Sequence, residues 1–187
     1  IPMMSRGNGL YVTTIAGLPA ATIVQFYVEG QDALGAVSTF PAAGPDSGAL
    51  FKVDDGLAAT NGLHNFRLIV SPANRDYLHG EVNLMSNDPL PATIIYDERE
   101  IYYDVGLRLK GSERARPYDV RIGFHVNFNS DQLFRGIHDS VSIDRSYSTG
   151  YGQREMLMNQ VMTHAGCVSG EYNDLIQVIT PLKQHTG

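Results

Sequence analysis

Two cations, Arg108 and Lys110, stand two positions apart in the segment 105–112, where they could bind a phosphate group. In a β-strand, residues two apart share a face, so both cations point one way while Leu107 and Leu109 point the other. The strand ends at a Gly-Ser dipeptide, which favours a turn. Two fixed cations beside a turn suit a phosphate. They equally suit a solvated sheet face, which is the commoner arrangement.

The charged residues around this segment are separated by sign. An acidic group precedes a basic one: Asp97, Glu98, Glu100 and Asp104, then Arg108, Lys110, Arg114, Arg116 and Arg121. Arginine offers a planar fork that matches phosphate or carboxylate. The net charge of −6 nevertheless gives no general attraction to nucleic acid or to an anionic membrane, so we expect neither as a partner.

The composition indicates a folded, β-rich chain. Its 187 residues suffice for one ordinary domain or two small ones, and 43% hydrophobic with 18% charged residues excludes a disordered chain. Nineteen glycines and nine prolines predict many turns. No apolar run approaches the roughly 20 residues that cross a bilayer.

Cysteine and histidine give little support to a metal site. The single cysteine, Cys167, excludes an internal disulfide and a cysteine-based zinc cluster, and we expect a buried structural thiol there. The six histidines lack the spacings typical of metal ligands. We therefore expect no metal ligand in this chain.

The elements that must position these side chains fall into two parts. In the first part we predict strands at 10–15, 23–29 and 49–53, with a Pro/Gly-rich stretch at 40–48. The small, polar residues 54–62 are typical of a linker. We therefore predict a boundary between residues 1–55 and residues 56–187.

In the second part the sequence predicts a strand at 64–70 and a short helix over 72–79, with Ser71 as its N-cap and Gly80 at its end. Further strands are predicted at 92–96, 101–110, 118–128, 140–144 and 175–180. A long helix is predicted over 153–164, stopped by Gly166. Its side chains at helical spacing, with the methionines, are expected to pack on the sheet: Met156, Leu157, Met158, Gln160, Val161, Met162 and His164. The order predicts an α+β fold, a β-rich mixed sheet with one long packed helix after a small β-sandwich-like segment.

The first part resembles the second half of a fibronectin type III-like sandwich. The segments that carry the resemblance are 14–19, 24–29 and 32–35. Such modules often precede catalytic domains in secreted bacterial proteins, which implies an extracellular or cell-surface location. Three of the roughly seven sandwich strands are represented. The resemblance therefore implies a partial module over residues 1–55.

Residues 64–187 resemble the spore-coat-type (CotH) atypical kinase family. Four pieces occur in the family's order: the strand and turn at 105–112, the strand at 124–128, the segment 134–137 leading to 141–144, and the helix from Gln153 to Gly166. No single piece is specific, and the signal is their order. The resemblance implies that 56–187 is the N-terminal part of a kinase-like domain.

This family uses ATP and Mg²⁺ to phosphorylate protein substrates. The resemblance implies that Lys110, or Arg108, binds phosphate, with Ser112 in the turn and Glu155 orienting the cation. Alternatively, Glu155 lies on a solvated face near the helix N-terminus, where a negative charge is favourable. The chain departs from the family at His125 and Asn127, where the family has lysines.

The family's catalytic and metal-binding aspartates lie beyond the position of Gly187. The resemblance therefore implies no catalytic residue in this chain, which we expect to be inactive alone, with phosphoryl transfer to a protein carried out by the parent protein. Sheet edges left open by truncation are also expected to favour self-association.

The alternative function is a non-catalytic β-rich structural, adhesion or carbohydrate-binding module. In a module of that kind Tyr96, Tyr102 and Tyr103 would form a sugar-stacking surface, although strand aromatics more often pack in the core. The glycine-rich residues 148–152 before the long helix could also offer backbone N–H groups to an anion, but a simple loop is the commoner reading.

Overall fold

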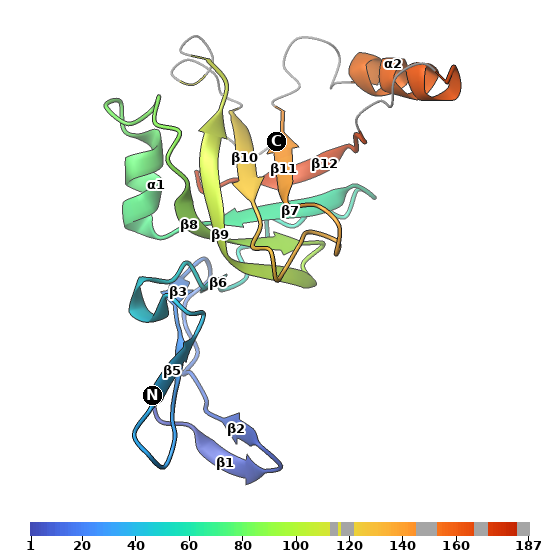
Figure 1. Ribbon diagram of the computed structural model, residues 1–187. Coiled ribbons are helices and arrows are strands. Elements are labelled where there is room, and N and C mark those ends of the chain that lie inside the picture. Colours follow the sequence, from blue (N-terminus) through green and yellow to red (C-terminus); the bar gives the residue numbers. More distant parts are fainter. Residues whose placement is uncertain (113–115, 117–121, 145–152, 167–171, 183–187) are drawn as a thin grey trace.

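The computed structural model of the chain describes residues 1–112, 116, 122–144, 153–166 and 172–182 (Figure 1). Its body is a six-stranded sheet in the order β11-β10-β9-β8-β7-β12. All neighbours are antiparallel except β12, which runs parallel to β7. The strands are β7 (His64–Ile69), β8 (Leu90–Tyr96), β9 (Glu100–Lys110), β10 (Gly123–Asn127), β11 (Ser140–Ile143) and β12 (Ile176–Ile179). The predicted α+β class and mixed sheet are confirmed.

One face of this sheet forms the hydrophobic core. Side chains from β7, β8, β9 and β10 alternate into it, and Phe66, Ile94, Leu107 and Phe124 are almost fully buried. Leu107 and Leu109 are buried while Arg108 and Lys110 are half-buried on the opposite face, as the alternation of a strand requires. The predicted facing of the two cations is therefore confirmed.

The two helices begin and end where the sequence predicts. Helix α1 (Pro72–His79) is capped by Ser71, whose side chain accepts a hydrogen bond from the Asn74 backbone N–H at 3.1 Å. Helix α2 (Gln153–His164) ends before Gly166, which has a φ of 68°. None of the described helices is both long enough and apolar enough to cross a membrane.

The expected packing of α2 on the sheet is wrong in this structure. None of its described residues is buried, with Leu157 63% and Val161 54% exposed, and the helix stands apart from the sheet (Figure 1). The apolar positions of α2 are interleaved with Arg154, Glu155 and Asn159, so no wide apolar stripe drives the helix onto the sheet.

The N-terminal part consists of short two-stranded sheets, of which one, β3–β6, lies against the body while the others extend away from it (Figure 1). The pairs are β1 (Met4–Gly7) with β2 (Leu10–Val12), β3 (Ile23–Gln25) with β6 (Leu50–Lys52), and β4 (Val28–Gln31) with β5 (Val37–Phe40). A 3-10 turn, η1 (Gly44–Asp46), precedes β6. Strands β1 and β5 were not among the predicted elements.

The predicted single strand at 23–29 is wrong, because the chain changes partner within it. Gln25 still pairs with β6, and its side chain donates to the backbone oxygens of Pro45 at 3.0 Å and Ser47 at 2.7 Å. From Val28 onward the backbone pairs with β5 instead. One straight strand cannot pair with both β6 and β5, because the two strands lie in different directions.

The second face of β7 and β8 is covered by residues 47–59. The Thr93 hydroxyl donates to the Gly48 carbonyl at 2.6 Å and accepts from the Leu50 N–H at 2.8 Å. A Cβ at Gly48 would lie 2.6 Å from the backbone nitrogen of Ala92, so only glycine permits this approach. The segment therefore packs directly on the sheet.

A buried arginine also connects this segment to the sheet. Arg67 on β7 is 3% exposed, and its guanidinium donates to both oxygens of Asp55 at 2.9 Å and to Glu98 at 3.0 and 3.2 Å. Lys52 lies 2.6 Å from the same Asp55 carboxylate. Asn65 on β7 adds two hydrogen bonds between its side chain and the Ala59 backbone. The predicted linker 54–62 is thus bound to β7 by ion pairs and hydrogen bonds. The domain boundary after residue 55 stays a prediction.

The charge network gives a first testable prediction. Burial raises the pKa of Asp55, but hydrogen bonds from Lys52 and Arg67 outweigh it and lower the pKa to about 2. Replacing Asp55 by Asn leaves Arg67 buried with one anion fewer, so we expect the free energy of unfolding at neutral pH to fall by about 2–4 kcal/mol in denaturant titrations.

The matched control is Asp54→Asn, an exposed neighbour that keeps the oxygen accepting from the Gly56 N–H. We expect it to change stability by less than about 0.5 kcal/mol. The Asp55 pKa is depressed, so its contribution is present above the ordinary value of 3.8 and is lost as the pH falls toward 2. The difference in free energy of unfolding between wild type and Asp55→Asn should therefore become smaller as the pH falls from 3.8 toward 2. An equal effect of both substitutions would contradict the network's role.

Candidate anion-binding site

The face of the sheet opposite the core carries a polar patch on β9, β10 and β11. The pairing aligns Gly106 with Asn127 and Ser140, and Arg108 with His125 and Ser142. Lys110 pairs with Gly123 in the next row. We call the four residues Arg108, Lys110, His125 and Ser142 the basic face.

The central row of the basic face runs across three strands. Arg108 lies opposite His125 on one side, and Ser142 lies opposite His125 on the other. The His125 Nδ1 atom is 2.9 Å from the Ser142 hydroxyl oxygen. This contact fixes the imidazole between the serine and the arginine.

Lys110 reaches across β10 because the residue between it and β11 has no side chain. Its ammonium lies 3.4 Å from a carboxylate oxygen of Asp144, and a Cβ on Gly123 would lie 3.3 Å from the Lys110 Cβ and 2.9 Å from the Ile143 carbonyl oxygen. Both partners of this ion pair are exposed to solvent, and such pairs contribute little stability. Lys110 can therefore turn toward a ligand at small cost.

Arg108 has no carboxylate partner among the residues that the structure describes. Its guanidinium makes one long hydrogen bond, at 3.4 Å to the Leu109 carbonyl. Its charge acts on two neighbours, because it helps to lower the pKa of both Arg116 and His125. A half-buried cation in this position is electrostatically complementary to a bound anion.

His125 is held in its neutral form by this environment. Burial lowers its pKa below the ordinary 6.5, and the charges of Arg108 and Lys110 lower it further, while Asn127 and Asp139 act in the opposite direction. At neutral pH the imidazole is therefore a neutral hydrogen-bonding group.

Arg116 belongs to the basic group of the sequence, but its guanidinium is hydrogen-bonded within the protein and does not face a ligand site. It is 4% exposed and donates to the carbonyls of Gly111 at 3.0 Å and of Leu84 and Ser86 at 2.9 Å, and to the Asn87 side chain at 2.9 Å. It therefore fastens the turn after Lys110 to the loop after α1. Its role here is to position that turn.

The other two predicted phosphate-site residues, Ser112 and Glu155, do not lie on the strands that form the basic face. Ser112 lies in the exposed turn directly after β9. Glu155 lies in the first turn of α2 and is exposed. Within the described parts of the chain, Glu155 makes no ion pair with Arg108 or Lys110, and Lys110 pairs with Asp144. The Lys110–Glu155 arrangement stays a prediction.

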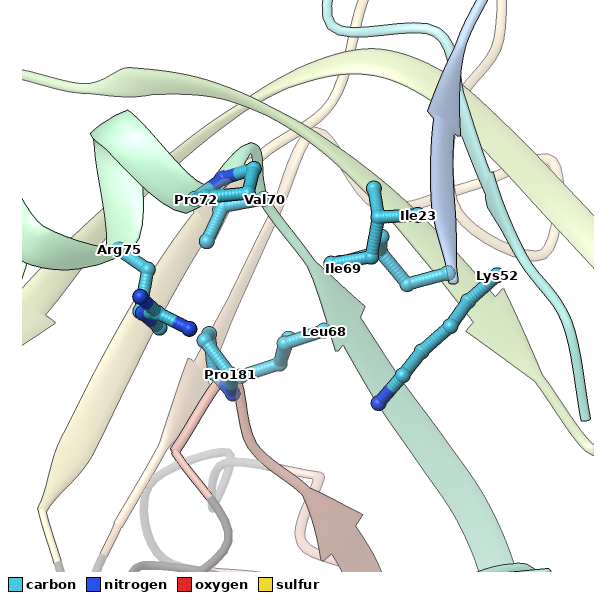
Figure 2. Close-up of a pocket in the computed structure, with 8 residues that line it drawn as sticks. All are labelled: Ile23, Lys52, Leu68, Ile69, Val70, Pro72, Arg75 and Pro181. Atoms are coloured by element: carbon cyan, nitrogen blue, oxygen red, sulfur yellow. The ribbon is translucent and has the colours of Figure 1, made fainter. Parts of the chain in front are cut away.

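A small pocket lies where the N-terminal segment meets β7 and α1. Figure 2 shows Lys52 and Arg75 on opposite sides of it, with Ile69 and Pro181 in its wall. Its volume of about 30 Å³ leaves room for no more than a few water molecules. Lys52 pairs with Asp55 and Arg75 pairs with Asp76, so both cations already have anionic partners. This pocket does not hold a nucleotide.

The tyrosines proposed for sugar stacking are placed as core residues. Tyr96 and Tyr102 are buried, and they pack with Phe66, Phe128 and Phe134 in an aromatic cluster. Tyr103 is half-buried with its ring against Phe26. Burial raises the pKa of all three hydroxyls. Two of the three rings are thus closed to a ligand, and core packing, the more common arrangement for strand aromatics, is confirmed for Tyr96 and Tyr102.

Several predicted features lie outside the described residues: Cys167, Arg114, Arg121, the glycine-rich residues 148–152 and the start of the strand expected at 118–128. Across the ranges that are described, no three or more His, Cys, Asp or Glu residues group so that they could hold a metal ion.

Neither the scan against protein-family models nor the search of curated proteins gives a match to this chain.

Two residues of the basic face were missed by sequence reasoning. His125 was interpreted as the loss of a cation, and Ser142 was not considered. Both are separated from Arg108 along the chain and join it only through strand register. The alternation of 124–128 was a signal that could have found His125, because it places this residue on the polar face.

The positioning role of Arg116 can be tested by stability. Lysine has a point charge on a flexible stem and cannot make the four directional hydrogen bonds of the Arg116 fork. We expect Arg116→Lys to lower the free energy of unfolding by about 2 kcal/mol in denaturant titrations. The control is Arg99→Lys, at an exposed position on the β8–β9 turn, with an expected change below about 0.5 kcal/mol. Unchanged stability in Arg116→Lys would contradict the role.

Proposed function

We propose that the basic face binds the phosphates of ATP, as part of the first lobe of a CotH-like kinase whose parent protein transfers phosphate to a protein substrate. The observation that carries the proposal is Arg108, a half-buried cation without a carboxylate partner in the described parts of the chain, beside Lys110 and the neutral His125. The ordered resemblance of segments 105–144 and 153–166 to that family also supports it.

The residues of the basic face fit phosphate better than they fit a carboxylate or a sugar. Arg108 offers several N–H groups in one plane, and Lys110 adds a second charge from two positions along the same strand. Polyphosphate carries several charges in a row, which matches cations spaced along a strand. ATP would supply the phosphoryl group, and these side chains would hold and orient its phosphates.

Mg²⁺ enters this proposal together with the nucleotide. The described residues contain no cluster of three metal ligands, so the ion would be held largely by the phosphate oxygens. We assign the transfer step to the parent protein, which in the resembling family carries its catalytic and metal-binding aspartates beyond the matching region. This chain itself would bind and orient the nucleotide phosphates.

Calorimetric titration of Mg-ATP into this chain tests the proposal. We expect binding at about millimolar affinity or better, weakened about tenfold by either Arg108→Gln or Lys110→Ala, because each removes one charge-assisted contact. The control Arg99→Gln removes an exposed cation at the opposite end of β9 and should leave the affinity unchanged.

Titration of tripolyphosphate measures how much of the affinity for ATP comes from the phosphates alone. Tighter binding of ATP than of tripolyphosphate would show that the base contributes. No binding of ATP, or binding that Arg108→Gln and Lys110→Ala leave unchanged, would overturn the proposal. The alternative of a non-catalytic β-rich structural, adhesion or carbohydrate-binding module of an extracellular protein would then be preferred.

We also propose that the chain self-associates through its open strand edges. The two-stranded β4–β5 sheet exposes all residues of β4, and Val37 on β5 is 56% exposed. Isolated two-stranded sheets are marginally stable and gain by adding strands. We expect the average mass in sedimentation experiments to rise with concentration, and Val37→Lys to reduce that rise. A monomer at the highest concentration reached would contradict the proposal.

A further inference from the structure

The central row of the basic face places a histidine where an anion held by Arg108 would lie. His125 and Arg108 are directly opposite each other on neighbouring strands, with side chains on the same face. Side chains paired in this way stand roughly 5 Å apart at Cβ, which lets both reach one small ligand. The row is completed by Ser142 on the third strand.

The contact with Ser142 decides which imidazole atom can face a ligand. Nδ1 lies 2.9 Å from the serine hydroxyl, so a ligand would contact the ring through Nε2, in competition with the hydrogen bond between the ring and the Asn127 side chain. When Nδ1 of the neutral imidazole accepts from the hydroxyl, the proton resides on Nε2, which then donates. When the ring is protonated, Nδ1 donates to the serine and Nε2 still donates. Protonation therefore makes Nε2 a donor whichever way the hydrogen bond with Ser142 runs in the neutral ring.

We propose that His125 contacts the bound anion through Nε2, with Ser142 as its positioning residue, and that the basic face binds doubly charged oxyanions more tightly when His125 gains a proton. This inference rests on the proposed function, since it assumes that Arg108 and Lys110 hold phosphate. It adds a third contacting group and a dependence of affinity on pH.

The charges that surround His125 explain the direction of this dependence. Arg108 and Lys110 face it from β9, Asn127 from its own strand, and Ser142 and Asp139 from β11 and the turn before it. Burial and the two cations lower the pKa of the imidazole. An anion bound in the row would cancel the effect of Arg108 and stabilise the imidazolium. By linkage, protonation and anion binding then favour each other.

Sulfate is the suitable probe, because it keeps two charges between about pH 5 and pH 8 and does not titrate with the histidine. Imidazole NMR signals, assigned with His125→Gln, follow the protonation of His125 in the intact chain. We expect sulfate to raise the pKa of His125 by about half a unit, beyond the effect of sodium chloride at matched ionic strength. The titration curve of His138, which lies outside the row, serves as the internal reference.

Two variants distinguish the contact that His125 makes with the anion from the effect of its positive charge. Wild type should bind sulfate about two- to threefold more tightly at pH 5.5 than at pH 7.5, since a pKa shift of half a unit corresponds to at most about threefold in affinity. His125→Gln keeps a donor near the position of Nε2 but cannot be protonated, so its affinity should not change with pH. Ser142→Ala should reduce the effect of sulfate on His125 without removing the binding by Arg108.

The outcomes distinguish this inference from the proposed function. If Arg108→Gln weakens ATP binding but sulfate has no more effect on His125 than sodium chloride has, the inference is wrong and the nucleotide site stands. If sulfate raises the pKa of His125 and ATP does not bind, the anion site stands and its assignment to a nucleotide is wrong. An equal pH dependence in wild type and His125→Gln would also overturn the inference.

Discussion

The burial of Arg67 is the constraint on which the arrangement of this chain depends. A guanidinium that is 3% exposed is tolerable only with anions in direct contact, because removing a charge from water costs several kcal/mol. Asp55 and Glu98 supply those anions from two directions. Residues 47–59 must therefore lie on the second face of β7, and the turn between β8 and β9 must bring Glu98 back to the same point.

The same network explains why the basic face keeps its positive charge. Three of the four acidic residues that precede the basic group form ion pairs at the other end of β9, where Glu98 pairs with Arg67, Glu100 with Arg135 and Asp97 with His64. The fourth, Asp104, accepts a hydrogen bond from the Gly48 N–H at 2.6 Å. An eleven-residue strand separates its ends by on the order of 30 Å, well beyond the distance at which exposed charges interact in salt. Asp97, Glu98 and Glu100 are thus close to Arg108 in the sequence but far from it in space, and they do not neutralise it.

Local signals were sufficient for several elements. Ser71 and Pro72 define the start of α1, and glycines follow both helices, so their bounds were predictable from capping chemistry. The alternation in 105–110 predicted which side chains of β9 are buried. The strand expected at 23–29 failed because its two halves have different partners, and the packing of α2 failed because helical spacing alone does not provide a continuous apolar surface.

The amino-acid sequence was enough to predict the class of the fold, the two cations of the basic face and their common direction. These follow from periodicity and capping, which act between residues a few positions apart. Only the tertiary structure shows that His125 and Ser142 lie beside Arg108 and that Asp144 faces Lys110 across Gly123. It also shows that Arg116 connects the turn after β9 to the loop after α1. The physical reason is strand register, which is set by long-range pairing and core packing and is not encoded in any local stretch of residues.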